Sequence, residues 1–218
     1  MKFVVLCSTN GSVFSHFMES FDVDYDFRVV SDRQCGAIEF ARRNGINSFV
    51  YATKSGEEFS NFLANEYEAD KEVLFISFYT RLLKGRFLKE HEGRIVNFHP
   101  SVLPACPGQN GFGDTIASGS RFVGSTVHFI DDGMDTGLPL IQAAYPRDPK
   151  EDITMLRHRV FLQQVVSLAQ VVDWFTNGRI TLEGRSVSIQ DVEFCIGEFS
   201  PNLDGKYQEY FSKAIECH

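Results

Sequence analysis

Several features are missing from this 218-residue sequence, and each absence excludes a class of protein. No apolar run approaches the roughly 20 residues that span a bilayer, so we predict no membrane partner. The apolar start, Met1–Leu6, lacks the charged leader and long core of a signal peptide. Basic residues are too few for a nucleic-acid partner, because 21 Lys and Arg against 29 Asp and Glu leave a net charge of −8.

Paired cysteines are also missing. The cysteines are odd in number and show no C-x-x-C spacing, which excludes a disulfide framework and a zinc site of that kind. We interpret them as reduced thiols of a cytoplasmic protein, and for the one in the proline-rich loop we favour simple packing over reactivity. They are Cys7, Cys35, Cys106, Cys195 and Cys217.

What is present predicts an α/β protein. Hydrophobic residues make up 43% and charged residues 23%, as in an ordinary globular chain of one domain with a modest appendage. Short apolar runs alternate with stretches of helical period, which indicates an open, mostly parallel twisted sheet flanked by helices. The first half predicts strands at 2–7, 27–30, 48–51, 73–78 and 95–98, and helices at 13–21, 35–44, 57–67 and 81–91.

The second half changes character. His99–Gly113 is rich in proline and glycine and predicts a long loop. Strands are expected at 124–130 and 138–145, then a long helix over 152–176 that ends at Asn177-Gly178. From Arg179 onward we expect one or two short strands and a weakly patterned polar tail.

The turn after the first strand predicts an anion site. Asn10, Gly11 and Ser12 lie between a strand and a helix, where backbone N–H groups and the helix dipole favour a phosphate. An ordinary Asn-Gly turn with a serine cap explains the same residues, and pattern alone leaves the two interpretations even.

A second candidate lies at the end of the fifth predicted strand. Alternation puts Asn97 and His99 on one face, about 7 Å apart, and Pro100 ends the ladder. An amide donor beside an imidazole suits a reaction that builds negative charge on a carbonyl oxygen. A structural histidine at a strand edge is the simpler explanation, and for a lone histidine the better one.

The acidic turn at 131–137 is a third candidate. Asp135 either faces water in an ordinary turn or folds back to His99, orients it and raises its basicity. His128, on the preceding strand, is a supporting candidate with an equally good structural role. A metal held by these side chains lacks any supporting spacing, so we predict no metal.

Together these motifs resemble the folate-dependent formyltransferase family, over roughly residues 1–182. Within it the chain is most similar to the purine-biosynthesis branch, which formylates glycinamide ribonucleotide. The similarity rests on Asn10-Gly11-Ser12, on the run from Ser77 to Leu83, on Val96–Pro104, on Gly124–Phe129 and Asp135–Gly137, and on Trp174-Phe175 with Gly178-Arg179.

The resemblance implies a Rossmann-like catalytic domain over 1–182 and an enzyme that moves the formyl group of 10-formyltetrahydrofolate onto a small-molecule amine. It implies a catalytic triad of Asn97, His99 and Asp135, and a substrate phosphate on Asn10, Gly11 and Ser12. It further implies a monomer or homodimer and a folate pterin against the following residues: Arg81, Leu82, Leu83, Ile130, Asp131, Asp132 and Met134.

Three departures leave the acceptor amine open. Phe112 stands in a segment where the purine enzymes carry a histidine, Gln164 replaces a glutamate on the long helix, and Val13 replaces a polar residue. A neutral Gln164 cannot pair with an amino group as a carboxylate would. An amino sugar nucleotide or hydroxyornithine is therefore the alternative acceptor.

The same residues are compatible with two functions that involve no acceptor amine. Water as acceptor would give a formyltetrahydrofolate hydrolase, and loss of catalysis would give a folate- or nucleotide-binding module. Residues 183–218 form an extension of unknown role without a counterpart in the family, and their apolar members suit an edge strand, a dimer contact or an acceptor pocket.

Overall fold

A computed structural model describes residues 1–68, 70–184 and 186–216 of the chain. The chain divides into two compact units. Unit 1 comprises residues 1–97 and 129–134, and unit 2 comprises residues 98–128 and those from 135 onward. Within the described ranges, no helix combines the length and apolar character that crossing a bilayer requires.

Unit 1 is built on parallel strands in the order β5-β4-β1-β2-β3. The central strand β1 buries every residue after Lys2, which explains why it is a continuous apolar run and not an alternating one. The last two residues of β5 already belong to unit 2. The strands are β1 (Lys2–Cys7), β2 (Asp26–Ser31), β3 (Asn47–Val50), β4 (Val73–Phe78) and β5 (Ile95–His99).

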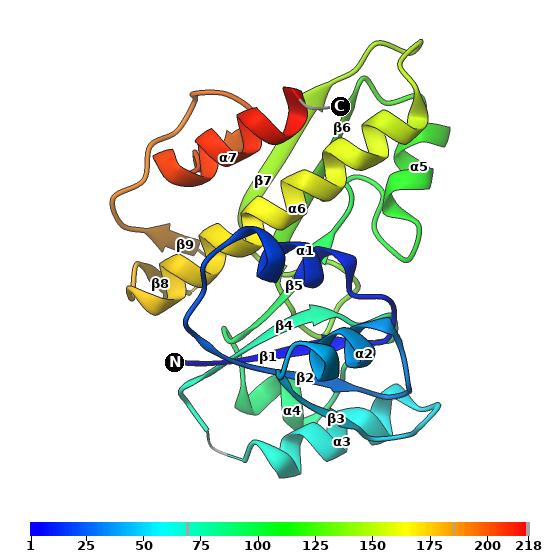
Figure 1. The fold of residues 1–218 in the computed structure, drawn as a ribbon, viewed down its shortest axis with the longest axis vertical. Helices are drawn as coiled ribbons and strands as arrows, with labels where there is room; N and C mark the ends of the chain where they lie inside the picture. Colours follow the sequence, from blue (N-terminus) through cyan, green and yellow to red (C-terminus); the bar gives the residue numbers. More distant parts are fainter. Residues whose placement is uncertain (69, 185, 217–218) are drawn as a thin grey trace. The chain divides into compact units, whose positions relative to one another are not determined.

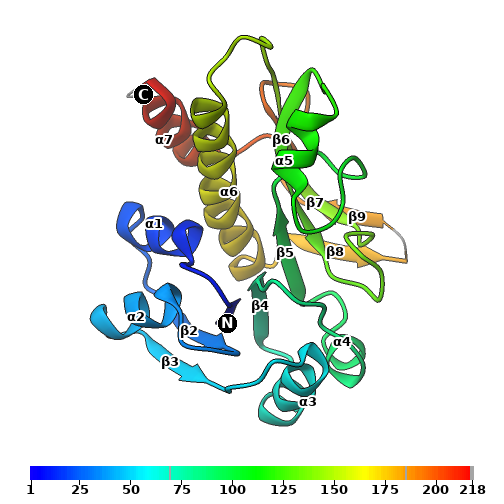
Figure 2. The same ribbon diagram turned by 90° about the vertical axis from the view of Figure 1, so that its right-hand side faces the viewer.

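The helices of unit 1 follow its strands, as the sequence predicts. Their predicted ends differ from the observed ones by one residue for the first three helices. Ser55 caps α3 by accepting the Glu58 N–H, and α3 lies beside α4 (Figure 2). The helices are α1 (Ser12–Ser20), α2 (Gly36–Arg43), α3 (Gly56–Glu66) and α4 (Arg86–Glu90).

The predicted helix over 81–91 is wrong at its start. Gly85 has φ 69° and ψ −138°, a conformation outside the helical region, so α4 begins only at Arg86. Arg81 instead follows β4 in irregular backbone and forms an ion pair with Asp32.

Unit 2 contains antiparallel strands in the order β10-β7-β6, and a separate hairpin of β8 and β9. Strand β6 can approach β7 closely because Gly124 has no Cβ that would meet the Ala143 carbonyl. The strands are β6 (Phe122–Phe129), β7 (Pro139–Pro146), β8 (Ile180–Glu183), β9 (Ser186–Ile189) and β10 (Phe199–Ser200).

The helices of unit 2 include two that the sequence did not predict. Helix α5 (Gly111–Ala117) begins inside the predicted loop 99–113, because Phe112 is buried against Val123, Leu156 and Val160. Helix α7 (Gly205–Glu216) replaces the predicted polar tail and lies beside the long α6 (Ile153–Thr176), as Figure 1 shows.

Helix α7 and strand β10 make the described residues after 182 part of unit 2. Phe199 pairs with Ala143 of β7, and its ring meets Phe211 of α7 edge to face at 4.9 Å. The Glu198 carboxylate accepts one hydrogen bond from the Arg159 Nε–H, shared between its two oxygens, and another, of 2.6 Å, from Nη2. The boundary predicted at residue 182 stays a prediction.

The predicted fold class is confirmed. Strands β1 to β5 form a run of parallel neighbours, the antiparallel pairs follow later in the chain, and helices alternate with the strands along the sequence. The cysteines at 7, 35, 106 and 195 are free thiols, while Cys217 lies outside the described residues.

Candidate functional site

The end of β5 carries Asn97 and His99, two residues apart and therefore on one face of the strand. The strand ends at His99, directly before Pro100 and one residue beyond its predicted end. Asn97 is half-buried and His99 is only 3% exposed. A side chain so well enclosed is held in one orientation by its neighbours, and those neighbours decide its chemistry.

Both ring nitrogens of His99 face an oxygen atom. Nδ1 lies 3.5 Å from Asp135 Oδ2, and Nε2 lies 2.8 Å from the backbone carbonyl oxygen of Cys106. The structure therefore brings Asp135 to His99, which is the geometry that the sequence predicts. Each ring nitrogen that carries a hydrogen can therefore donate a hydrogen bond to the oxygen that it faces.

Asp135 is held in place by backbone as well as by imidazole. Its Oδ2 accepts a 2.7 Å hydrogen bond from the Gly108 N–H, and its Oδ1 lies 3.6 Å from His128 Nε2. Its own backbone is left-handed, with φ 54°, a conformation that aspartate tolerates better than most residues. The carboxylate thus lies among two imidazoles and one amide, all of them in unit 2.

Sequence reasoning missed the backbone groups that complete this cluster. The Cys106 carbonyl and the Gly108 N–H come from the proline- and glycine-rich segment before α5. Gly111 is also close, because a Cβ there would lie 2.6 Å from His99 Nε2. The glycines at 108 and 111 were the available signal, since glycine marks close approach of the backbone to a functional group.

The predicted phosphate turn lies in unit 1, at the start of α1. Gly11 has φ 65° and occupies the N-cap position of the helix, and Asn10 and Ser12 are exposed. Gly11 is tightly packed, since a Cβ would approach that of Ala37 to 2.7 Å. The turn therefore presents the N-terminal amides of α1 on a rigid base, which is the arrangement that an anion requires.

The residues predicted to bind folate also fall in unit 1. Leu82 and Met134 are about half exposed although apolar, while Leu83 is buried and Ile130 packs against the unit's core. The Ile130 N–H donates to the Ile95 carbonyl at 2.9 Å, and Asp131 accepts the Gly133 N–H at 3.0 Å in a turn that leaves Asp131 and Asp132 exposed. The segments 81–83 and 130–134 thus both present backbone groups and an exposed apolar side chain to a ligand.

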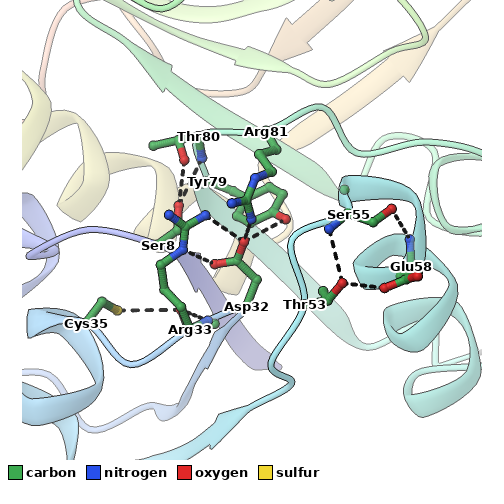
Figure 3. A network of polar contacts seen from close by, with 12 residues as sticks. Ser8, Asp32, Arg33, Cys35, Thr53, Ser55, Glu58, Tyr79, Thr80 and Arg81 are labelled. Atoms are coloured by element: carbon green, nitrogen blue, oxygen red, sulfur yellow. Dashed lines mark hydrogen bonds and ion pairs between the residues drawn. The ribbon is translucent and has the colours of Figure 1, made fainter.

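A buried ionic cluster around Asp32 was not predicted. The Asp32 side chain is fully buried and accepts from Arg33 Nε and Nη2, each at 2.8 Å (Figure 3). It also pairs with Arg81 and accepts the Tyr79 hydroxyl at 3.2 Å. Burial raises the pKa of Tyr79 to about 12, although nearby Arg33 opposes the shift, so this hydroxyl stays a donor at neutral pH.

The three residues that depart from the purine pattern have different surroundings. Phe112 is a core residue, and the Arg157 guanidinium lies 4.4 Å from its ring centroid. Val13 is buried in α1, and Gln164 is half-buried on α6. Phe112 and Val13 therefore have packing roles, and of the three Gln164 alone carries a polar group suited to contact with a substrate.

Comparison with known proteins identifies similar chains. A profile of the formyl transferase family matches residues 1–172. The phosphoribosylglycinamide formyltransferase of Bacillus subtilis is 33% identical over 168 residues, covering 73% of this chain and 86% of that protein. Its namesake from Mycobacterium tuberculosis is 31% identical over 195 residues, covering 86% and 91%. The crystal structure of glycinamide ribonucleotide transformylase 1 from Symbiobacterium toebii matches with a TM-score of 0.78 at 30% identity, covering 88% and 94%.

Proposed function

We propose a formyl-transfer function from one premise: the chain belongs to the formyl transferase family. This membership confirms the resemblance seen in the sequence. We propose that the donor is 10-formyltetrahydrofolate and that the acceptor is the amine of glycinamide ribonucleotide, the substrate for which the relatives are named.

The observation that carries the proposal is the His99–Asp135 pair, with Nδ1 and Oδ2 3.5 Å apart and the carboxylate fixed by the Gly108 N–H. When an amine attacks a formyl carbon, a C–N bond forms and the formyl oxygen becomes negative. Positive charge on the His99 ring attracts that oxygen electrostatically, and Asp135 stabilises the charge on the imidazole. The bond from carbon to the donor nitrogen then breaks, and the proton lost by the amine goes to that nitrogen.

The remaining predicted residues receive roles by the same argument. The Asn97 amide donates to the developing oxyanion, and removal of one such donor typically costs about 10²–10³ in rate. Asn10, Gly11 and Ser12 bind the substrate phosphate at the start of α1. The backbone of Arg81–Leu83 and of Ile130–Met134 receives the pterin, with exposed Leu82 and Met134 as its apolar neighbours.

A turnover assay tests this function. Tetrahydrofolate release is followed with glycinamide ribonucleotide, with an amino sugar nucleotide, with hydroxyornithine and with no amine, for the wild type and for His99→Ala. We expect turnover with glycinamide ribonucleotide alone and its near loss in the variant. Turnover only with another amine would replace the acceptor, and formate release without an amine would make the chain a hydrolase.

Binding of folate without turnover on any of these would instead indicate a binding module. We also propose a cytoplasmic location, which the free thiols at 7, 35, 106 and 195 support. A monomer or homodimer remains the expectation, and sedimentation measurements distinguish the two.

A further inference from the structure

Two thiols lie close together in unit 1, beside the turn that joins β1 to α1. Cys7 is the last residue of β1, and Cys35 occupies the N-cap position of α2. The Cys35 Sγ lies 3.7 Å from the Cys7 carbonyl oxygen, to which its S–H donates. The fold therefore brings together two nucleophilic groups that are 28 residues apart in the sequence and have no role in the proposed chemistry.

The two thiols also influence each other electrostatically. Burial raises the pKa of the Cys7 thiol, although hydrogen bonds with Thr9 oppose the shift, and negative charge on Cys35 raises it further. Because Coulomb interactions weaken with distance, such an effect indicates that the two sulfur atoms are near neighbours.

The two thiols differ in their access to solvent. Cys7 is fully buried, whereas Cys35 is partly exposed, so a small oxidant dissolved in water reaches Cys35 first. In redox-sensing pairs an accessible cysteine is oxidised, and a neighbouring cysteine then resolves it to a disulfide. Disulfides that form in the cytoplasm are mostly transient bonds of this kind. The contrast in burial thus assigns the oxidised position to Cys35 and the resolving position to Cys7.

The hydrogen bonds of both thiols are weak. Cys7 Sγ lies 3.7 Å from the carbonyl oxygen and 3.7 Å from the hydroxyl oxygen of Thr9, and Cys35 Sγ lies 3.5 Å from Ser31 Oγ. Sulfur is a poor donor and a poor acceptor, so turning either side chain away from these partners costs little free energy. The two sulfur atoms can therefore approach each other by rotation of their side chains.

The turn at residues 9–12 is packed against both cysteine-bearing segments. The Thr9 carbonyl accepts a 3.2 Å hydrogen bond from the Ala37 N–H of α2. A Cβ on Gly11 would lie 2.7 Å from the Ala37 Cβ and 3.5 Å from Cys7 Sγ. A bond that draws the start of α2 towards the end of β1 therefore removes Cys7 from Thr9 and displaces the turn.

We propose that Cys7 and Cys35 form a reversible disulfide in response to hydrogen peroxide, and that this bond weakens phosphate binding by the turn at residues 10–12. The second part rests on the proposed function, because it takes this turn to hold the substrate phosphate. Two small side chains that only fill space between β1 and α2 are the competing explanation.

The chemistry of the proposed modification takes two steps. Peroxide transfers one oxygen to the Cys35 sulfur, which gives a sulfenic acid and a molecule of water. The Cys7 sulfur then attacks the Cys35 sulfur, the S–S bond forms, and the S–O bond breaks as the hydroxyl leaves with the Cys7 proton as a second water. The two thiols have then given two electrons to the peroxide, and an added dithiol returns them.

Peptide mapping by mass spectrometry on the full chain tests for the bond. The protein is treated with hydrogen peroxide, its remaining thiols are alkylated, and the peptides are compared with and without dithiothreitol. We expect the peptides of Cys7 and Cys35 to be joined and to separate on reduction. The exposed Cys195 is the internal control. Joined peptides that contain mainly Cys195, or oxidation of Cys35 without any joined peptide, would overturn the proposal.

Titration calorimetry with glycinamide ribonucleotide tests the consequence for the turn. We expect peroxide to weaken its binding about tenfold, which is the order of one lost charge-assisted hydrogen bond to a phosphate, and dithiothreitol to restore it. Cys35→Ser is the matched variant, because serine keeps the size and polarity of the partly exposed side chain and cannot form the bond. Peroxide should leave the affinity of Cys35→Ser unchanged, and an equal loss in this variant would refute the proposed consequence, as would an unchanged affinity of the oxidised wild type.

A second variant, Cys7→Ala, tests the resolving role. Without Cys7 we expect Cys35 to proceed to sulfinic acid at peroxide concentrations that give the wild type only the reversible bond. The same oxidation products in both proteins would contradict that role. These measurements also distinguish this proposal from the proposed function: a joined peptide without binding or turnover of glycinamide ribonucleotide supports the disulfide alone, and turnover without a joined peptide supports formyl transfer alone.

Discussion

The chain contains two enclosed aspartates with contrasting surroundings, one in each unit. Asp32 is gripped at 2.8 Å by Arg33, paired with Arg81 and bonded to Tyr79. Asp135 accepts one short bond, from the Gly108 N–H, and faces His99 and His128 at 3.5 and 3.6 Å. The first carboxylate is paired with guanidinium groups, which are permanently charged, and the second faces two imidazole rings and a backbone amide.

This difference separates two uses of a buried carboxylate. A carboxylate that accepts hydrogen bonds from arginines fixes the direction of their guanidinium groups. A carboxylate beside imidazoles orients the rings and is placed to stabilise positive charge that develops on them, which is the role proposed for Asp135. We therefore expect the aspartate side chain to have a structural role in unit 1 and a role in catalysis in unit 2.

The largest expected effect on kcat comes from replacing Asp135 with asparagine, and the same replacement at Asp32 is the comparison. Asp135→Asn removes the charge that supports a protonated His99, and we expect kcat for formyl transfer to fall by about 10²–10⁴. Asp32→Asn is expected to leave kcat within about threefold, because the contacts of Asp32 are with Arg33, Tyr79 and Arg81 and not with His99. Steady-state kinetics at saturating donor measure both, and a comparable loss of kcat in the two variants would erase the contrast.

A second prediction concerns how unit 2 is held together. Phe211 of α7 is 2% exposed and packs edge to face on Phe199, so Phe211→Ala should destabilise the protein by about 3–5 kcal/mol. Chemical denaturation measures the free energy of unfolding, with Phe211→Leu as the control that keeps most of the apolar volume. A loss below about 1 kcal/mol would show that helix α7 is dispensable to unit 2.

A third prediction concerns the pH dependence of stability that Tyr79, a member of the Asp32 cluster, confers on the protein. Burial raises the pKa of Tyr79 from 10 to about 12, so the folded state binds this proton more tightly than the unfolded state. The resulting stability is present below pH 10 and is lost as pH rises towards 12. Wild type should lose about 2 kcal/mol more than Tyr79→Phe across this range in denaturation experiments. If the free energy of unfolding changed with pH equally in the two proteins, the prediction would be wrong.

The smallest effect is expected at Gly111. A Cβ there would lie 2.6 Å from His99 Nε2, so Gly111→Ala should displace the ring and lower kcat by about tenfold with little change in stability. Gly205→Ala is the matched control, because among the described residues no atom lies within 4 Å of a Cβ at that position. Kinetics and thermal unfolding are compared for the two variants, and unchanged kcat in Gly111→Ala would mean that the ring position is not critical.

The strands of unit 1 were predictable because parallel strands bury both faces and read as unbroken apolar runs, as at Lys2–Cys7 and Val73–Phe78. Helices α5 and α7 were not. Helix α5 spans seven residues of a glycine-rich segment, and the apolar pattern of α7 is weak, with Tyr207 and Phe211 as its buried residues. Such helices are stabilised by tertiary packing and not by local sequence preference.

The contacts of the candidate site also divide into those that the sequence predicted and those that it did not. The approach of Asp135 to His99 followed from the motif and from the family resemblance. The sequence did not predict the contacts of the Cys106 carbonyl and the Gly108 N–H, because backbone groups leave no sequence signal. It did not predict the Asp32 cluster either, because an ion pair between residues 49 positions apart, such as Arg81 and Asp32, leaves no periodic pattern.

The sequence by itself determined the fold class, the family and the side chains able to carry formyl transfer, because hydrophobic period and motif spacing are local properties of the chain. Only the tertiary structure decided which oxygen each ring nitrogen of His99 faces, and which charge Asp32 neutralises. Those choices depend on where distant segments converge, and burial then makes each unmatched charge or donor costly enough to fix the arrangement.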